Sequence, residues 1–142
     1  DMEPQARAAY EFMTDATVIE VGFIDHAQIT MAGCSPDGLV GEHGMVEIKC
    51  PNTATHIETL LTGVIDGKYM KQMQFQMACA DKLWCDFVSF DPRLPPEMQL
   101  FIKRVRADGG EIEAIETAVK DFLQDVATTV SDLRARFMQV AA

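Results

Sequence analysis

The sequence contains no apolar run near the roughly 18 residues that a membrane-spanning helix needs, and no signal peptide opens the chain. It also has no surplus of positive charge, because its formal net charge is −10. Proteins that coat nucleic acid non-specifically normally carry a basic surplus, so this charge argues against that class. Any nucleic-acid role therefore depends on a local basic patch, on bound metal ions, or on both.

Cysteine and histidine patterns typical of metal sites are also missing. The four cysteines include no C-x-x-C pair and are Cys34, Cys50, Cys79 and Cys85. This spacing favours buried thiols of a cytosolic protein over an iron–sulfur cluster. The three histidines are scattered at positions 26, 43 and 56. Such scatter favours turn or surface positions over a zinc site.

The length of 142 residues suits one domain with a real core. Hydrophobic periodicity and turn residues predict helices over residues 3–14, about 53–63, 67–81 and 111–137, and strands over 18–24, 28–33, 45–50, 83–91 and 99–107. The strands over 18–24 and 28–33 are separated by a D-H-A turn and are expected to pair with each other, and residues 37–40 are expected to be extended. This order predicts an α+β or mixed α/β domain with helices flanking a central sheet.

The last predicted helix has an apolar stripe at helical spacing. Its members are Ile112, Ile115, Val119, Phe122, Val126, Val130 and Leu133. We expect this stripe to be buried against the body of the domain.

One acidic and basic constellation stands out in residues 33–51, GCSPDGLVGEHGMVEIKCP. Strand alternation places Glu47 and Lys49 on one face and Val46 and Ile48 on the other. The preceding hairpin arm can bring Asp37 close to Glu47. Two facing carboxylates repel unless a cation lies between them, and their hard oxygen atoms suit Mg²⁺ or Mn²⁺. A lysine beside such a metal can orient or deprotonate water and offset charge on a phosphate.

A simpler interpretation of the same residues is available. Glu47 and Lys49 could form the solvent face of an edge strand and pair weakly, and S-P-D-G could be an ordinary turn. An isolated E-x-K favours this interpretation, because the pattern is short and common. The whole arrangement is more demanding, since the aspartate precedes E-I-K by about ten residues and the strand ends in C-P.

S-P-D-G…E-I-K-C-P resembles the PD-(D/E)XK nuclease signature, and its flanks resemble the lambda-type phage exonucleases, also called YqaJ-like viral recombinases. EPQARAAYEF, KYMKQMQFQM and F-D-P-R also fit this family, so the similarity covers most of the chain. The resemblance implies a central mixed sheet flanked by helices. The fold class we expect is therefore a restriction-endonuclease-like α/β core, as one nuclease domain over residues 1–142.

The resemblance implies roles for particular residues. Asp37, Glu47 and the Ile48 main-chain carbonyl would bind magnesium, with manganese as a substitute, and Lys49 would be the catalytic lysine. Glu3 would lie near the metal, although a helix start also attracts acids for its dipole. In the helix over 67–81, a polar stripe beside the apolar one makes Gln72 a further candidate.

DNA contacts are expected from few residues. The main candidates are Tyr69, Lys71 and Arg93, and further positive charge could come from Lys68, Lys103, Arg104 and Arg106. Each of these could equally be an ordinary surface residue. Family members resemble rings of three subunits around DNA, so only the channel needs to be basic. The resemblance further implies double-stranded DNA ends as substrate, a single-strand annealing protein as partner, and a bacterial cytoplasmic location with a phage or prophage origin. Because the chain begins at Asp1, we expect an upstream segment that helps hold the DNA 5′ phosphate to be missing.

The expected function is a magnesium-dependent exonuclease that hydrolyses linear double-stranded DNA from 5′ to 3′ and releases mononucleotides during recombination. Two alternatives remain. One is a site-specific endonuclease of the same superfamily, which a closed circular substrate would distinguish. The other is a non-catalytic, nuclease-like binding module, which the acidic charge favours and the complete D…E-x-K set disfavours.

Overall fold

The computed structural model describes residues 2–138 of the chain. Its helices are α1 (Glu3–Thr14), α2 (Thr53–Thr62), α3 (Gly67–Ala80), the short 3₁₀ helix η1 (Pro96–Met98) and α4 (Gly109–Met138). Its strands are β1 (Val18–Ile19), β2 (Ile24–Asp25), β3 (Gly33–Cys34), β4 (Gly38–Val40), β5 (Gly44–Lys49), β6 (Trp84–Phe90) and β7 (Leu100–Arg106).

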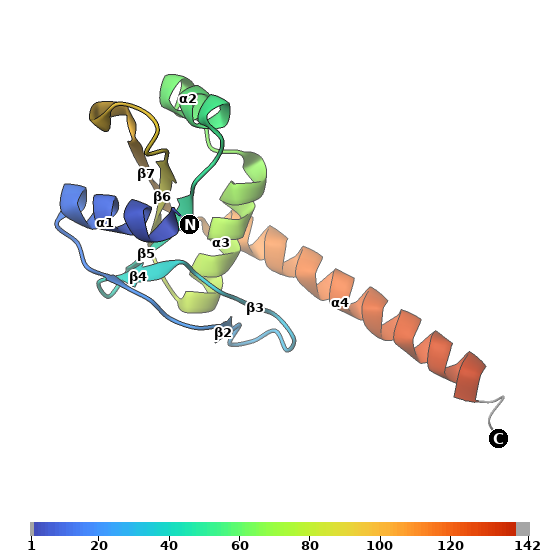
Figure 1. The fold of residues 1–142 in the computed structure, drawn as a ribbon. Helices are drawn as coiled ribbons and strands as arrows, with labels where there is room; N and C mark the ends of the chain where they lie inside the picture. Colours follow the sequence, from blue (N-terminus) through green and yellow to red (C-terminus); the bar gives the residue numbers. More distant parts are fainter. Residues whose placement is uncertain (1, 139–142) are drawn as a thin grey trace.

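A five-stranded sheet in the order β1-β4-β5-β6-β7 forms the centre of the molecule. Strands β5 and β6 are parallel, whereas all the other neighbours in this sheet are antiparallel. A parallel pair needs a crossover connection, which α2 and α3 provide here. The predicted mixed α/β fold with flanking helices is confirmed (Figure 1).

Helices cover both faces of the sheet and divide its core into two clusters. On one face, Ala6 and Tyr10 of α1 pack in a cluster with Val46, Ile48 and Val88. On the other face, the methionines of α3 form a second cluster, whose members are Met73 and Met77 with Met45, Ile65, Cys85, Phe87 and Val105. Residues that alternate along β5 therefore enter different clusters, as the pleat of a strand requires.

The boundaries around the crossover follow local signals in the sequence. Asn52 caps α2 by accepting a hydrogen bond from the Thr55 N–H, and Gly63 ends that helix with a φ of 66°. Asp66 caps α3 in the same way through the Lys68 N–H. The predictions for both helices and for the strand over 45–50 are confirmed to within one or two residues.

The predicted pairing of strands 18–24 and 28–33 is wrong. Residues 18–19 instead pair with β4, and a separate two-stranded sheet pairs Ile24 with Cys34. The ring of His26 explains the difference, because its Nδ1 accepts the backbone N–H groups of Gln28 and Ile29, both at 3.0 Å. These bonds turn the chain where a second strand was expected.

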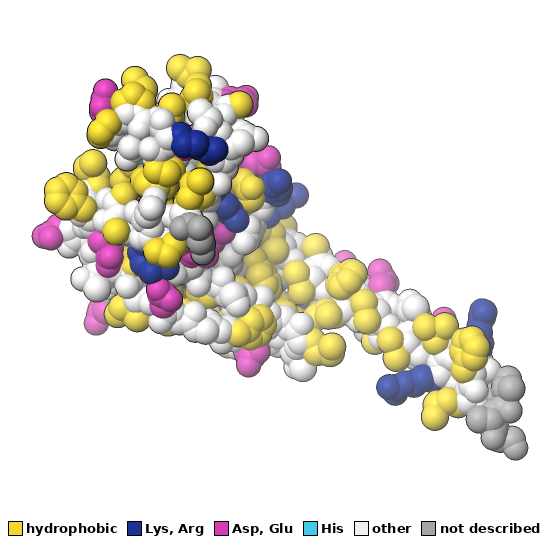
Figure 2. Space-filling view, viewed as in Figure 1, with side chains coloured by type: hydrophobic (Ala, Val, Ile, Leu, Met, Phe, Trp, Pro, Cys, Tyr) yellow, Lys and Arg dark blue, Asp and Glu magenta, His cyan; other side chains and the backbone are white. Residues whose placement is uncertain are grey.

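The predicted burial of the α4 stripe is also wrong. The helix begins against α3 and then extends away from the body, with hydrophobic atoms visible along its length (Figures 1 and 2). Phe122 is 65% exposed and Leu133 is 50% exposed, and no residue of α4 is buried. Periodicity identifies the apolar face correctly, but nothing within residues 2–138 covers that face beyond the first turns of the helix.

The histidine prediction of turn or surface positions holds for His43, which is exposed, and for His26, which is buried but lies in a turn. It is wrong for His56, which is buried within α2. Cys34, Cys79 and Cys85 are buried free thiols, as expected, and Cys50 is half-buried. None of the helices within residues 2–138 is both long enough and apolar enough to span a membrane.

Candidate active site

Glu47 and Lys49 lie on the face of β5 that α3 covers, near the carboxyl end of the strand. The Lys49 Nζ is 2.9 Å from the Glu47 Oε1. Only 2% of Glu47 is exposed, so the interpretation as a solvent-facing edge strand is wrong. Burial of a carboxylate is costly without a compensating charge, and Lys49 provides that charge here. Burial disfavours the charged Lys49, but its hydrogen bond and ion pair with Glu47 outweigh this effect and raise its pKa.

Asp37 is placed beside this pair by the hairpin of β4 and β5. Its Oδ2 accepts a hydrogen bond of 2.7 Å from the Ile48 N–H. Burial raises the pKa of Asp37, and the negative charge of Glu47 adds to this effect. The hydrogen bond from Ile48 opposes both without cancelling them. Asp37 and Glu47 therefore act on one another electrostatically, as the spacing predicted.

Glu3 reaches the same region from the start of α1. Burial raises its pKa, and the neighbouring Asp37 raises it further through its charge and a side-chain hydrogen bond. Arg7 lowers the pKa of Glu3, but the combined effects of burial and Asp37 are larger. Glu3 and Asp37 thus interact directly across two elements that lie far apart in the sequence.

The donor set fits a hard divalent cation. Burial, and after it the neighbouring carboxylates, raise the pKa values of Glu3 and Asp37, so a bound cation would stabilise their charged forms. Carboxylate oxygens are the ligands that Mg²⁺ and Mn²⁺ prefer. Within the described part of the chain, no three Asp, Glu, His or Cys side chains are already grouped closely enough to hold a metal. A main-chain carbonyl such as that of Ile48, together with water, would have to complete the coordination.

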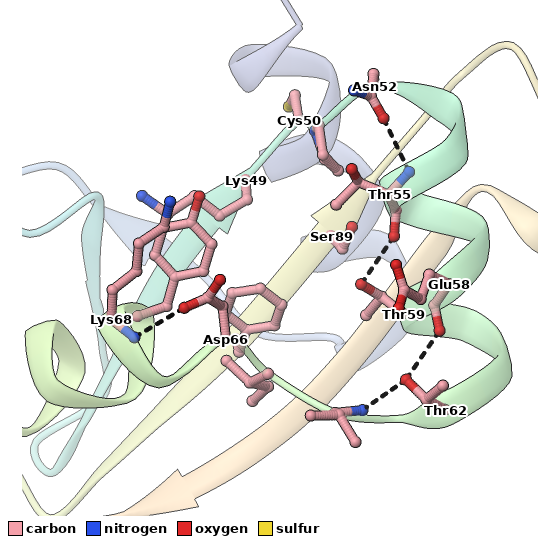
Figure 3. A pocket seen from close by; sticks show the side chains of 15 residues that line it. Lys49, Cys50, Asn52, Thr55, Glu58, Thr59, Thr62, Asp66, Lys68 and Ser89 are labelled. Atoms are coloured by element: carbon pink, nitrogen blue, oxygen red, sulfur yellow. Dashed lines mark hydrogen bonds between the residues drawn. The ribbon is translucent and has the colours of Figure 1, made fainter.

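A cleft of about 610 Å³ opens beside Lys49, between α2 and the start of α3 (Figure 3). Lys49 and Ser89, partners in the parallel register of β5 and β6, lie at its base. Hydroxyl groups of Thr55, Thr59 and Thr62 line the α2 wall. Tyr69 lines the opposite wall and stacks on Phe87, with 6.0 Å between their ring centroids.

The remaining predicted residues are not all brought to this cleft. Tyr69 lines the cleft, and the Lys49 ammonium lies 4.5 Å from the centroid of its ring. Gln72 is exposed on α3 and is not among the residues that line the cleft. Lys71 lines a separate apolar groove between α3 and α4. Arg93 is half exposed. Its Nε donates a hydrogen bond of 2.8 Å to Asp91, and its Nη2 donates one to the Pro51 carbonyl, so Arg93 stabilises a turn.

Two features of the cleft go beyond what the sequence predicted. Lys68 was only one of several basic residues expected to supply charge for DNA, and the structure places it in the cleft, where it faces Tyr69. His56 is fully buried and anchors α2, because its Nδ1 lies 2.7 Å from the Ser89 Oγ and its Nε2 lies 2.8 Å from the Met98 carbonyl. The helical position of His56 on the inner side of α2 was the available signal for the second feature.

Comparisons with known proteins identify the family of the chain. Residues 1–83 match the YqaJ-like viral recombinase domain. Two crystal structures of an alkaline exonuclease from Laribacter hongkongensis, one in complex with dAMP, are 50% identical to the chain. Their TM-scores are 0.96 and 0.97, and the alignments cover 98% of this chain and 71% and 72% of theirs.

A phage-related exonuclease from Haemophilus somnus 129PT shares the fold at 15% identity, with a TM-score of 0.72 over 93% of this chain and 70% of its own. No curated protein gives a significant match. The family match covers more than half of the chain, and the 50% identity extends over nearly all of it. The chain therefore belongs to the YqaJ-like viral recombinase family and resembles its alkaline exonucleases.

Proposed function

We propose that this chain is a magnesium-dependent exonuclease that hydrolyses linear double-stranded DNA, from 5′ to 3′, and releases mononucleotides. The observation that carries the proposal is the position of Lys49, which is ion-paired with the buried Glu47 and opens onto the cleft. The 50% identity to an alkaline exonuclease supports the reaction class. Metal identity, polarity and duplex preference are part of the proposal.

Each acidic residue has a defined part in the proposed mechanism. Asp37, Glu47 and the Ile48 carbonyl would bind the metal. Glu3, which contacts Asp37, would help to bind a second ion or position the attacking water. When bound, the divalent cation would supply an activated water and neutralise charge on the departing oxygen.

Lys49 would act from beside these ligands. Its raised pKa keeps it as an ammonium ion, which can orient a water molecule and balance the charge that develops on the phosphate. Glu47 holds Lys49 in place through the 2.9 Å contact. Loss of either partner would leave the other with an uncompensated charge in a largely buried setting.

The cleft is proposed to hold the nucleotide at the end of the strand. Its wall combines lysines, hydroxyl groups and the Tyr69 ring, which suit a phosphate, a sugar and a base respectively. The related alkaline exonuclease whose structure contains dAMP supports a mononucleotide as the occupant.

The experiment is a comparison of linear and closed circular duplex DNA, each incubated with and without magnesium, with released mononucleotides as the readout. We expect release from the linear substrate only, and only with magnesium. Cutting of the circle would instead support the site-specific endonuclease. Release from neither substrate would contradict the proposed activity of this chain and leave two accounts, an enzyme that needs the expected upstream segment and a binding module.

The expected ring of three subunits is also part of the proposal. The exposed apolar side chains of Phe122, Val126, Val130 and Leu133 support it, because the outer part of α4 packs against nothing within residues 2–138. Sedimentation equilibrium would test it, with a Val126→Glu, Leu133→Glu double variant and Gln124→Glu as the control. A trimer that only the double variant dissociates is expected, whereas a monomeric wild-type chain would contradict it. Docking of an annealing protein and the bacterial cytoplasmic location stay predictions.

A further inference from the structure

Two ammonium groups lie near one tyrosine ring in the cleft. The Lys49 Nζ is 4.5 Å from the Tyr69 ring centroid, and the Lys68 Nζ is 5.0 Å from the same centroid. Figure 3 shows both lysine side chains at the same side of the cleft, across from the α2 wall. Lys49 comes from the end of β5 and Lys68 from the first turn of α3, so the fold brings together two charges that are distant in the sequence.

The two lysines differ in how their charge is compensated. Lys49 is paired with Glu47 at 2.9 Å. No carboxylate in the described part of the chain forms an ion pair with Lys68. Asp66 is its nearest acidic neighbour in sequence, but the Asp66 side chain accepts the backbone N–H of Lys68 at 2.9 Å. Lys68 therefore adds a positive charge without an ion-pair partner among the described residues next to Lys49.

An anion between the two ammonium groups would remove their mutual repulsion. A phosphate group suits this position, because it offers several acceptor oxygens to donors that approach from different directions. Both ammonium groups make cation–π contacts with the Tyr69 ring, and these contacts restrict the positions of the two lysine side chains. Glu58 lies on the α2 wall and would keep an anion on the lysine side of the cleft.

We propose that Lys68 is a second phosphate-binding residue, which joins Lys49 in holding a phosphate group of the nucleotide in this cleft. The proposal rests on the proposed function, since it deepens the description of the same substrate. Lys68 binds substrate in this account and takes no part in activating water. Its effect should therefore appear in the affinity for phosphorylated ligands.

Calorimetry with deoxyadenosine monophosphate and with deoxyadenosine, both in EDTA, separates the phosphate from the rest of the ligand. The proteins are the wild-type chain, Lys68→Met and the control Lys120→Met, which changes an exposed lysine on α4. We expect Lys68→Met to weaken binding of the monophosphate about tenfold, the scale of one charge-assisted contact, and to leave binding of the nucleoside unchanged. Lys120→Met should match the wild type for both ligands.

The proposal is overturned if Lys68→Met binds the monophosphate as tightly as the wild type, or if it weakens both ligands equally. Absence of monophosphate binding by the wild type would overturn it as well. The nuclease assay is independent of this result. A chain that binds the monophosphate through Lys68 but releases no nucleotide from DNA would contradict the proposed function alone, and an active chain indifferent to Lys68→Met would contradict only the role of Lys68.

Discussion

The Asp37 carboxylate accepts a hydrogen bond of 2.7 Å from the backbone N–H of Ile48, and this contact joins the two halves of the acidic motif. S-P-D-G and E-I-K are eleven residues apart at these positions, yet the β4–β5 hairpin places them in direct contact. The bond orients one carboxylate oxygen toward the backbone. This hydrogen bond therefore gives Asp37 a structural role that can be tested separately from metal binding.

Two substitutions of Asp37 should separate these parts. Asp37→Asn retains an oxygen that can accept from Ile48, so its free energy of unfolding should stay close to that of the wild type. Asp37→Ala loses the acceptor and should unfold more easily by about 1 kcal/mol. Both variants should lose affinity for magnesium. Calorimetry measures this affinity, and urea denaturation measures the free energy of unfolding. Magnesium binding that survives in both variants would rule out Asp37 as a ligand.

Tyr10 connects α1 to the sheet through the buried carboxylate of Asp86, which also pairs with the half-exposed Arg104. Its hydroxyl donates a hydrogen bond of 2.7 Å to the Asp86 Oδ2. The same carboxylate accepts a hydrogen bond of 2.8 Å from the Arg104 Nε. Tyr10→Phe removes one donor from a buried carboxylate and should lower the free energy of unfolding by about 1 to 3 kcal/mol. The control is Phe12→Leu on the same helix, since Phe12 is 90% exposed. Equal denaturation midpoints for the two variants would contradict this role of the hydroxyl.

Asp91 should make stability depend on pH in the acid range. The hydrogen bond from the Arg93 side chain, followed by that from Thr53, lowers its pKa from 3.8 to about 2. A lowered pKa means that the unfolded chain binds the proton more readily. The stabilisation is therefore fully present above about pH 5 and is lost as the pH falls through about 2.

Asp91→Asn should remove this dependence. The difference in free energy of unfolding between wild type and variant should be constant at neutral pH and should shrink as the pH falls from 3.8 toward about 2. Urea denaturation over a series of pH values measures it. A difference that grows toward acid would have the wrong sign for a lowered pKa.

Local signals predicted the central elements because they agree with the tertiary structure there. The strand at β5 has apolar residues on both faces apart from Glu47 and Lys49, and α2 and α3 carry a cap residue at each start. Alternation then placed Glu47 and Lys49 on one face correctly. The approach of Asp37 could be predicted as well, because a short hairpin restricts which residues face each other.

Other features depend on contacts that no local pattern encodes. The turn that His26 makes is a side-chain to backbone arrangement, and it replaced a strand that propensity favoured. The exposed face of α4 shows that amphipathicity identifies a face without identifying its partner. Lys68 gains its position only because α2 and α3 enclose a cleft, which sequence spacing does not reveal.

The most direct test of the account is the rate of nucleotide release from linear duplex DNA by Lys49→Met, with magnesium present. Lys120→Met is the matched control, and circular dichroism confirms that both variants are folded. We expect the rate for Lys49→Met to fall by at least about a hundredfold, as for loss of a group that stabilises transition-state charge, and the control to retain the wild-type rate. A folded Lys49→Met chain that releases nucleotides at the wild-type rate would contradict the account.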